Sequence, residues 1–286
     1  MDGTRPSRPL LIVNPMSGGG IASRRDLVGE CRRRGIEVVE FNVKDDLPAL
    51  ALAAIERGAD VVGMAGGDGS QAAVAAVAAE HDVPYVCIPA GTRNHFAADL
   101  GIDRHDVVGA LDAFLDGQER RIDLARVNGR VFVNIASLGF YGVVVQSPEY
   151  RDAKLRTVFE NLPRLIGPDI EPFDLRFAEP DGSAWLNAAV LLVSNNRYQV
   201  DARPGRGTRG AIDQGMLGVV AVGKPVPIWR EWTAPAFTVD SGDTVRLAVD
   251  GEAVALDPPL LFETMPGALR VRVPSDAGRR RSSARP

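Results

Sequence analysis

The first 120 residues alternate between short apolar runs and longer amphipathic or Ala-rich segments. The apolar runs predict buried strands at about 10–14, 38–43, 61–65 and 85–88, and the other segments predict helices at about 21–34, 47–57, 70–80 and 106–115. Strands that alternate with helices are typical of a parallel sheet with helices on both faces. Residues 1–120 are therefore predicted to form an α/β domain.

The pattern then changes to short strands joined by tight turns. Asn128-Gly129, Asp181-Gly182 and Asp250-Gly251 each lie between two runs that favour strands. Asn-Gly or Asp-Gly at such a place favours a two-residue hairpin turn. Residues 121–275 are therefore predicted to form a second domain, an antiparallel β-sandwich.

Two segments stand apart from this alternation. Residues 151–165 predict a helix with an apolar stripe, for which core packing is favoured over a lipid-contacting surface. Residues 276–286 are rich in Arg and Ser and predict a disordered basic tail. Arginines of this kind add attraction to an anionic membrane surface, so peripheral membrane contact through the tail is an open expectation.

Composition and charge narrow the class of protein. The chain has 286 residues, of which 45% are hydrophobic and 24% charged, which is typical of a globular protein with room for two cores. No apolar run reaches the roughly 18 residues of a membrane span, and the N-terminus lacks a signal-peptide pattern, so we expect a cytoplasmic protein. The net charge of −4 argues against nucleic acid as a partner. Cys31 and Cys87 fall in a predicted helix and a predicted strand, which indicates buried thiols.

The most informative segment is Gly66–Ser70, with the sequence Gly-Gly-Asp-Gly-Ser, between the predicted strand 61–65 and the predicted helix 70–80. Its glycines permit a sharp turn and close approach to a ligand, and a helix N-terminus presents N–H groups to phosphate. Asp68 would suit a bound Mg²⁺ or acceptance of a proton from an attacking hydroxyl. The alternative is an ordinary strand-to-helix turn in which Asp68 caps the helix.

Two further glycine-containing loops follow neighbouring strands. Asn14–Gly20 reads Asn-Pro-Met-Ser-Gly-Gly-Gly, and Pro89–Asn94 reads Pro-Ala-Gly-Thr-Arg-Asn. The first fits neither the dinucleotide fingerprint nor the P-loop. Because the carboxyl ends of parallel strands meet at one edge of a sheet, all three loops are predicted to form one phosphate-binding crevice.

These loops resemble, in order and spacing, the three nucleotide motifs of the diacylglycerol kinase catalytic domain family, which includes bacterial lipid kinases and sphingosine and ceramide kinases. The resemblance continues through Asn134-x-x-Ser137-x-Gly139 and Val193–Asn195 to Asp250–Glu252. It implies an NAD kinase- and phosphofructokinase-like N-terminal domain that binds ATP and Mg²⁺. It also implies transfer of the γ-phosphoryl group to a lipid hydroxyl at a membrane surface, that of diacylglycerol or a related lipid such as a sphingoid base.

The resemblance also implies roles for the matching residues. Glu252 is expected to accept the proton of the acceptor hydroxyl. Asp250 is expected to orient Glu252, to contact Mg²⁺, or to share the role of Glu252 as proton acceptor. Asp68 is expected to link Mg²⁺ to the phosphates. Nucleotide-binding residues would be Asn14, Pro15, Ser17, Gly18, Gly66, Gly67, Asp68, Gly69, Ser70, Gly91, Thr92 and Asn94. Outside the family context, Asp250-Gly251 is typical of a plain hairpin turn.

The chain departs from the family pattern at several positions. Ala72 and Ala73 stand where the family commonly has Asn-Glu, so the polar contacts of that pair are missing. His95 replaces the usual Asp and either contacts phosphate or packs. Asp213 is followed by Gln214 where bacterial members often carry two aspartates that hold an accessory Mg²⁺, which leaves Asp213 as the remaining candidate ligand there.

Two other functions stay open. The Gly-Gly-Asp-Gly motif is shared with the NAD kinase fold, so the protein could phosphorylate a nicotinamide nucleotide or another small molecule. The departures at Ala72, Ala73 and His95 also fit a nucleotide- or lipid-binding regulator without turnover. The arginines of Arg203–Gly210 indicate either an anionic ligand or a solvated loop. The sequence leaves the lipid, the nucleotide preference, a homodimer and an inner-membrane location undecided.

Overall fold

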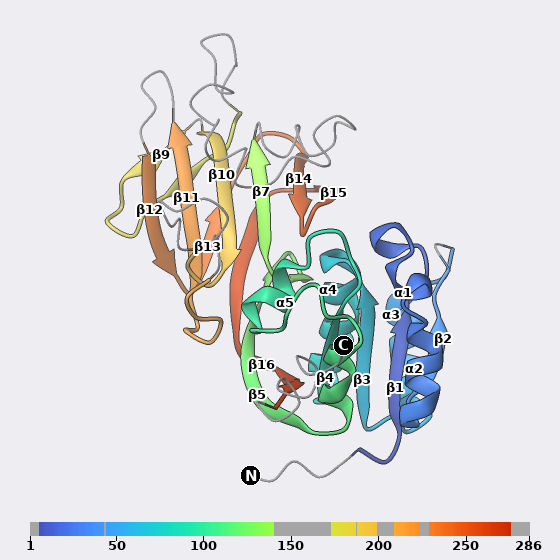
Figure 1. Cartoon of the computed structure of the whole chain (residues 1–286). Coiled ribbons are helices and arrows are strands. Elements are labelled where there is room, and N and C mark those ends of the chain that lie inside the picture. Colours follow the sequence, from blue (N-terminus) through green and yellow to red (C-terminus); the bar gives the residue numbers. More distant parts are fainter. Residues whose placement is uncertain are drawn as a thin grey trace. The chain divides into compact units, whose positions relative to one another are not determined.

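The computed structural model describes residues 6–42, 44–139, 173–186, 188–198, 209–223 and 229–275 (Figure 1). Contacts divide the chain into two compact units, one of residues 1–122 and 267–286, the other of residues 123–266. The helix expected at 151–165 and the tail 276–286 lie outside the described residues, as does most of the segment 203–210.

The first unit is built on a parallel sheet. Its strands are β1 (Pro9–Val13), β2 (Glu37–Glu40), β3 (Val61–Gly66), β4 (Tyr85–Pro89) and the end of β16 (Leu260–Pro274), in the order β2-β1-β3-β4-β16. All neighbours in this order pair in parallel. Every residue of β1, β3 and β4 is buried, which agrees with their continuous apolar sequences.

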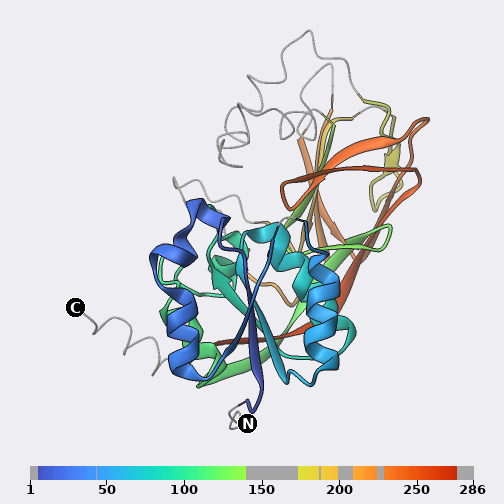
Figure 2. The ribbon, with the colours of Figure 1, turned by 90° about the vertical axis from the view of Figure 1, so that its right-hand side faces the viewer.

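Helices lie on both faces of this sheet, as the alternating pattern predicts (Figure 2). They are α1 (Ile21–Arg24), α2 (Leu27–Arg34), α3 (Leu47–Glu56), α4 (Asp68–Glu80) and α5 (His95–Asp99), with 3₁₀ turns η1 (Ser17–Gly19) and η2 (Gly109–Phe114). The single helix predicted at 21–34 is divided, because Asp26 has a φ of 46° and caps α2 by accepting a hydrogen bond from the Gly29 N–H. The segment predicted as a helix at 106–115 instead forms η2.

The second unit contains a six-stranded antiparallel sheet of order β12-β11-β10-β7-β14-β15. These strands are β7 (Ile135–Gly139), β10 (Ala188–Asn195), β11 (Leu217–Gly223), β12 (Trp229–Ala234), β14 (Val245–Val249) and β15 (Glu252–Leu256). The remaining strands are β5 (Gly117–Val127), β6 (Arg130–Phe132), β8 (Phe177–Ala178), β9 (Ala184–Trp185) and β13 (Ala236–Val239). The three predicted hairpins form between β5 and β6, β8 and β9, and β14 and β15.

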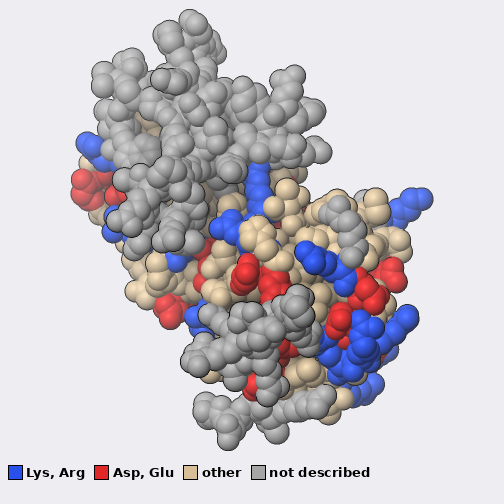
Figure 3. Space-filling model, viewed as in Figure 1, with Lys and Arg blue, Asp and Glu red and all other residues tan. Residues whose placement is uncertain are grey.

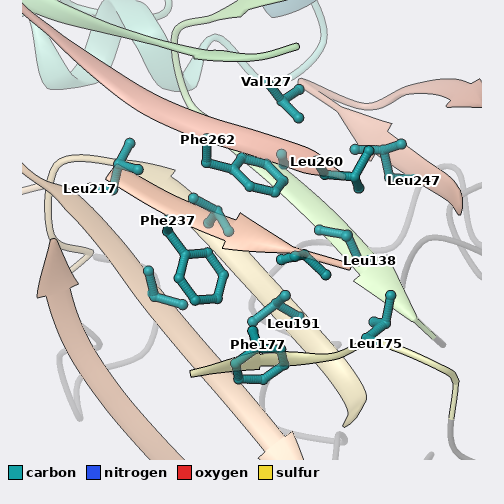
Figure 4. Close-up of a cluster of buried hydrophobic side chains, with 14 of the residues drawn as sticks. Val127, Leu138, Leu175, Phe177, Leu191, Leu217, Phe237, Leu247, Leu260 and Phe262 are labelled. Carbon is teal, nitrogen blue, oxygen red and sulfur yellow. The ribbon is translucent and has the colours of Figure 1, made fainter. Parts of the chain in front are cut away.

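The core of the second unit lies between this sheet and the strands β5, β6, β13 and β16 (Figure 4). Phe237 of β13 and Phe262 of β16 enter it from one layer, and Leu138 of β7 and Leu191 of β10 enter it from the other. Two sheets therefore pack face to face, as the predicted antiparallel sandwich requires.

The last strand belongs to both units. The first residues of β16 pair with β13, for example Leu260 with Val239, whereas Val271 pairs with Tyr85 of β4. The sequence predicts one second domain over 121–275, but the structure returns residues 267–275 to the first unit. Because β16 is one continuous strand of 15 residues, its hydrophobic pattern carries no signal that its partners change.

Charge and hydropathy agree with a folded chain of mixed surface. None of the described helices combines the length and apolar character needed to cross a bilayer. On the face shown in Figure 3, basic side chains lie beside acidic ones. Arg33, for example, pairs with Asp26 and Glu30, and Arg121 pairs with Asp82.

Both cysteines are buried and free, as the sequence predicts. Burial raises the pKa of the Cys31 thiol to about 12 and raises the pKa of the Cys87 thiol well above its ordinary value. Neither thiol therefore has thiolate character at neutral pH.

Candidate functional site

The loops that follow β1, β3 and β4 lie against one another through their glycines. A Cβ atom built on Gly18 would lie 2.6 Å from the carbonyl oxygen of Ala90, and one built on Gly91 would lie 2.5 Å from the Cα atom of Gly67. Only glycine fits at such distances. The structure therefore brings the three predicted loops together at the carboxyl edge of the sheet.

The first loop is closed by the side chain of Asn14. The Asn14 amide oxygen accepts a hydrogen bond from the Met16 N–H at 3.1 Å, and the Asn14 N–H donates to the Ala65 carbonyl of β3 at 2.9 Å. Pro15, between Asn14 and Met16 in the sequence, is half-buried. The glycines Gly18–Gly20 all have positive φ. The side chain of Asn14 thus shapes the loop, whose glycines bring backbone close to the neighbouring loop.

The second loop ends at the N-terminus of α4. Gly67 is the N-cap, no side chain caps it, and the first helical hydrogen bond runs from the Gln71 N–H to the Gly67 carbonyl at 2.9 Å. The N–H groups of Asp68, Gly69 and Ser70 therefore have no partner within the helix. Together with the helix dipole, they favour an anionic group here.

Three hydroxyl groups belong to this loop cluster. Ser17 and Ser70 are half-buried and Thr92 is exposed. Their hydroxyl groups make no hydrogen bond to the described residues. Each can therefore donate to a phosphate oxygen without breaking an existing contact.

Asp68 has a structural contact as well as a candidate chemical role. Its carboxylate accepts hydrogen bonds from the N–H groups of His95, at 3.2 Å, and Phe96, at 3.1 Å, at the start of α5. The helix-capping alternative is therefore present, for α5 rather than α4. The described residues contain no cluster of three His, Cys, Asp or Glu side chains suited to a metal. Asp68 fits Mg²⁺ as one carboxylate ligand beside phosphate oxygens and water, the common arrangement for that ion.

Asn94 is committed to the third loop itself. Its amide oxygen accepts from the Gly91 N–H at 2.8 Å, and its amide nitrogen donates to the carbonyl oxygens of Pro89 at 3.0 Å and Arg104 at 3.2 Å. Asn94 is buried and has a φ of 53°. The side chain thus holds the loop closed, because both its oxygen and its nitrogen bind backbone groups.

His95 packs beside Asp68 and remains neutral. Burial lowers the pKa of His95 below 6.5, although the negative charges of Asp68 and Asp99 oppose the shift. Its Nε2 atom is buried and has no hydrogen-bond partner among the described residues. Of the two expectations for His95, the described contacts favour packing.

The second unit holds the predicted Asp250–Glu252 motif, whose two carboxylates have different surroundings. Asp250 has a φ of 48° in the hairpin turn, and its carboxylate accepts from the N–H groups of the segment 133–135 at 2.8, 2.9 and 3.0 Å. Glu252 begins β15, has a side chain that is 55% exposed, and pairs with Arg130 at 2.7 Å. Asp250 therefore builds the turn, and Glu252 is the carboxylate open to chemistry.

Asp213 is followed by Gln214 and not by the second carboxylate that an accessory magnesium site would need. Its carboxylate is exposed and accepts a hydrogen bond from the Gln214 amide at 3.0 Å. No cluster of metal-ligating side chains exists among the described residues. The accessory site suggested by the family pattern thus has one carboxylate in this part of the chain.

Sequence reasoning missed a buried polar network in the second unit. Arg209 is 5% exposed and donates to the Val133 carbonyl, to the Asn195 carbonyl at 2.8 Å and to the Asn134 amide oxygen at 2.9 Å. Asp123 accepts from the Asn196 amide at 3.1 Å. Arg209 binds the Val133 carbonyl and the Asn134 side chain, in the same segment whose N–H groups bind Asp250. Arg209 is therefore a buried structural residue and not part of a solvated loop. The motif residues Asn134 and Asn195 were the available signal.

A second residue that sequence reasoning missed is Gln71, directly after the Gly66–Ser70 loop. Its side chain is buried and makes hydrogen bonds to the backbone of β3 and β4. A polar side chain in the first turns of an otherwise Ala- and Val-rich helix was the signal that could have found it.

Part of the chain is similar to known proteins of one family. Residues 8–127 match the family described as the diacylglycerol kinase catalytic domain. A protein of Mycobacterium tuberculosis (strain ATCC 25618 / H37Rv) named diacylglycerol kinase is 35% identical over 142 residues, which is 46% of each chain. A Staphylococcus aureus (strain Newman) protein of the same name is 30% identical over 200 residues, 64% of this chain and 60% of that protein. The matched region thus spans about half the length of these curated relatives.

Solved structures extend the similarity in fold. Two structures of proteins from Bacillus anthracis str. Sterne, both described with the name diacylglycerol kinase, superpose with TM-scores of 0.74 and 0.67 at 19% and 18% identity. Each alignment covers 96% of this chain and 99% of the other. At this level of identity the likeness establishes the fold, an α/β part followed by antiparallel sheets.

Proposed function

We propose, from the match of residues 8–127 to the diacylglycerol kinase catalytic domain family, that the protein is a lipid kinase that transfers the γ-phosphoryl group of ATP to a lipid hydroxyl. The observation that carries the proposal is the contact of three loops through Gly18, Gly67 and Gly91 at the carboxyl ends of β1, β3 and β4. The names of the relatives point to a hydroxyl of diacylglycerol as the acceptor. A related lipid such as a sphingoid base stays an alternative acceptor from the sequence resemblance.

The first unit would bind the nucleotide phosphates. The N–H groups at the start of α4 and the hydroxyls of Ser17, Ser70 and Thr92 are suited to phosphate oxygens. Asp68 would hold Mg²⁺ together with those oxygens, and the ion would neutralise charge that develops on the phosphates. Asn14 and Asn94 would keep the loops in shape.

The second unit would supply the base. The acceptor oxygen attacks the γ-phosphorus, the new O–P bond forms as the bond to the bridging oxygen of the β-phosphate breaks, and ADP leaves. Glu252 takes the proton that the acceptor hydroxyl releases. Arg130, 2.7 Å from this carboxylate, orients it before the acceptor arrives.

The test is phosphoryl transfer by the full chain with a matched pair of variants. Radiolabelled ATP is supplied with diacylglycerol, a sphingoid base or a total lipid extract in mixed micelles, and products are identified by mass. Glu252→Gln is expected to lower kcat by about 10²- to 10⁴-fold while ATP binding persists. Glu263→Gln is the control, because Glu263 pairs with Arg126 at 2.9 Å in a partly exposed carboxylate–arginine ion pair.

Other outcomes select other functions. Unchanged turnover in Glu252→Gln would reject Glu252 as the base. ATP binding without transfer to any lipid would favour the regulator, and transfer to NAD in a lipid-free assay would favour a small-molecule kinase. Because the proposed acceptor lies in a membrane, we also propose peripheral binding at the inner face, which cosedimentation with anionic vesicles tests.

A further inference from the structure

The residue that follows the Gly66–Ser70 loop has an unusual environment for a glutamine. Gln71 is 1% exposed and lies in the second turn of α4, at the face that packs on the sheet. A buried amide must find partners for both its oxygen and its nitrogen, or burial is costly. Its neighbours Ala72 and Ala73 offer no polar atoms in their side chains.

The Gln71 amide nitrogen meets the ends of two strands. It lies 3.0 Å from the Met64 carbonyl and 3.2 Å from the Gly66 carbonyl of β3, and 2.9 Å from the Ile88 carbonyl of β4. The amide oxygen accepts a hydrogen bond from the Tyr85 hydroxyl. All polar atoms of the side chain are therefore engaged with the two strands on which the second and third loops begin.

The geometry of the helix explains why this position reaches the strand ends. Side chains of an α-helix lean toward its N-terminus, so a residue just after the first turn extends back over the loop that precedes the helix. The Gln71 N–H also makes the first hydrogen bond of α4, to Gly67. One residue is thus joined to the Gly66–Gly67 turn through both its backbone and its side chain.

The hydrogen bonds of Gln71 matter because the second and third loops are close-packed where they meet. A Cβ on Gly91 would lie 3.1 Å from the Gly66 carbonyl oxygen, the same carbonyl that Gln71 binds. A shift of β3 relative to β4 by a fraction of an ångström would therefore change how the loops approach each other. Protein interiors transmit such shifts because they are densely packed.

We propose that Gln71 is a positioning residue that sets the spacing of the second and third phosphate loops, and that Tyr85 orients its amide. The chain thereby places a buried, hydrogen-bonded side chain just before Ala72 and Ala73, the positions at which the resembled family usually carries a polar pair. This inference rests on the proposed function for its nucleotide, but the contacts it invokes are present without one.

The test compares three variants of the full chain. Gln71→Leu removes every side-chain hydrogen bond at similar volume, and Tyr85→Phe removes only the hydroxyl that orients the amide. Val74→Ala is the control, because Val74 is fully buried in the same helix and its truncation lowers stability without removing a side-chain hydrogen bond. Amide hydrogen exchange of the segments 64–70 and 88–94 is measured without nucleotide, and KM for ATP and kcat are measured with it.

Gln71→Leu is expected to speed exchange in both segments and to raise KM for ATP by about tenfold, with a smaller change in kcat. Tyr85→Phe is expected to change both quantities in the same direction by less. Val74→Ala should lower the unfolding midpoint and leave KM within about twofold.

Exchange and KM in Gln71→Leu that match those of Val74→Ala would overturn the positioning role. If the unmodified protein neither binds ATP nor transfers phosphate, the proposed function fails. The exchange data still decide whether Gln71 holds the two segments together, so the two failures are distinguishable.

Discussion

The two units place their polar side chains differently. In the first unit the central strands β1, β3 and β4 carry only apolar side chains, and the polar groups around the loops, Asn94, Asp68 and Gln71, bind backbone at the ends of strands and loops. In the second unit Asp123 and Arg209 are buried in a network beside the sheet. The first unit thus leaves N–H groups and hydroxyls for a ligand, whereas the second uses its network to fix one backbone segment.

The largest expected difference in stability between variants concerns two buried arginines, Arg209 of the second unit and Arg272 of the first. Replacement of Arg209 by Met removes the guanidinium donor from the Asn195 carbonyl and the Asn134 amide oxygen and leaves the Val133 carbonyl with the Asn195 amide. We therefore expect the free energy of unfolding to fall by about 3–5 kcal/mol. Arg272 of the first unit donates only from Nε, to the Ala113 carbonyl at 3.1 Å, and its Nη2 atom is buried without a partner among the described residues.

Arg272→Met is the matched variant. Burial lowers the pKa of Arg272, which means that the charged form is disfavoured where it lies. We expect this substitution to change the free energy of unfolding by less than about 1 kcal/mol, or to raise it. Urea unfolding measures both variants, and equal losses would contradict the difference between the units.

The second prediction concerns the contact between loops in the first unit. In Gly91→Ala the new methyl group would meet the Gly67 Cα atom at 2.5 Å, so the second and third loops must separate. We expect ATP binding, measured by calorimetry, to weaken by about a hundredfold. Gly67→Ala is the control for folding, since its Cβ has only the Ser17 hydroxyl oxygen nearby, at 3.9 Å. A Gly91→Ala protein with undiminished affinity would show that the close approach is not needed.

The third prediction separates two carboxylates of one turn. Asp250→Ala removes the acceptor of three backbone N–H groups and is expected to lower the free energy of unfolding by about 2–3 kcal/mol. Glu252→Gln is expected to change it by less than about 0.5 kcal/mol, because the ion pair with Arg130 is exposed. Urea titrations followed by circular dichroism measure both, and a stability loss of the same size in Glu252→Gln would contradict the assignment.

The smallest effect is expected for the thiols, both of which lie in the first unit. With a pKa of about 12 instead of 9.0, roughly one Cys31 thiol in a thousand is ionised at pH 9. A raised pKa stabilises the fold fully below the unfolded value of 9.0, and this contribution is lost only as pH rises toward 12. A change from pH 7 to pH 9 should thus lower the free energy of unfolding by only about 0.4 kcal/mol per thiol. It should also produce almost no reaction with a disulfide reagent.

The reaction of the thiols with a disulfide reagent also distinguishes the two units, because both cysteines lie in the first unit and react only when that unit opens. In Arg209→Met the thiols should stay protected under conditions where the second unit has lost structure. Rapid modification of both thiols in the native protein at pH 7 would contradict their burial.

Much of the architecture follows from the sequence because it depends on local rules. The strands β1, β3 and β4 are continuous apolar runs, and the glycines that end them mark the loops. The hairpin turns carry Asn-Gly or Asp-Gly, with positive φ at Asn128 and Asp250 as that turn requires.

The structural roles of the polar residues could not be predicted in the same way. Asp68 binds backbone 27 and 28 residues away, and Asp250 binds backbone more than 110 residues away. A linear pattern shows that a carboxylate is present but not which N–H groups the fold brings to it. For that reason the sequence groups Asp250 with Glu252, and only the contacts separate their roles. Asp26 was missed likewise, since no propensity scale predicts a left-handed residue inside an amphipathic run.

The double membership of β16 has a consequence for protein synthesis. β4 has β3 along one side and residues 271 and 272 of β16 along the other. While the chain is translated, residues 1–122 therefore leave the ribosome with this edge of β4 unpaired, and an open strand edge invites pairing with other chains. The unit that is translated first is completed last, so a chain that stops before residue 267 lacks one strand of its parallel sheet even though every residue of the three loops has been made.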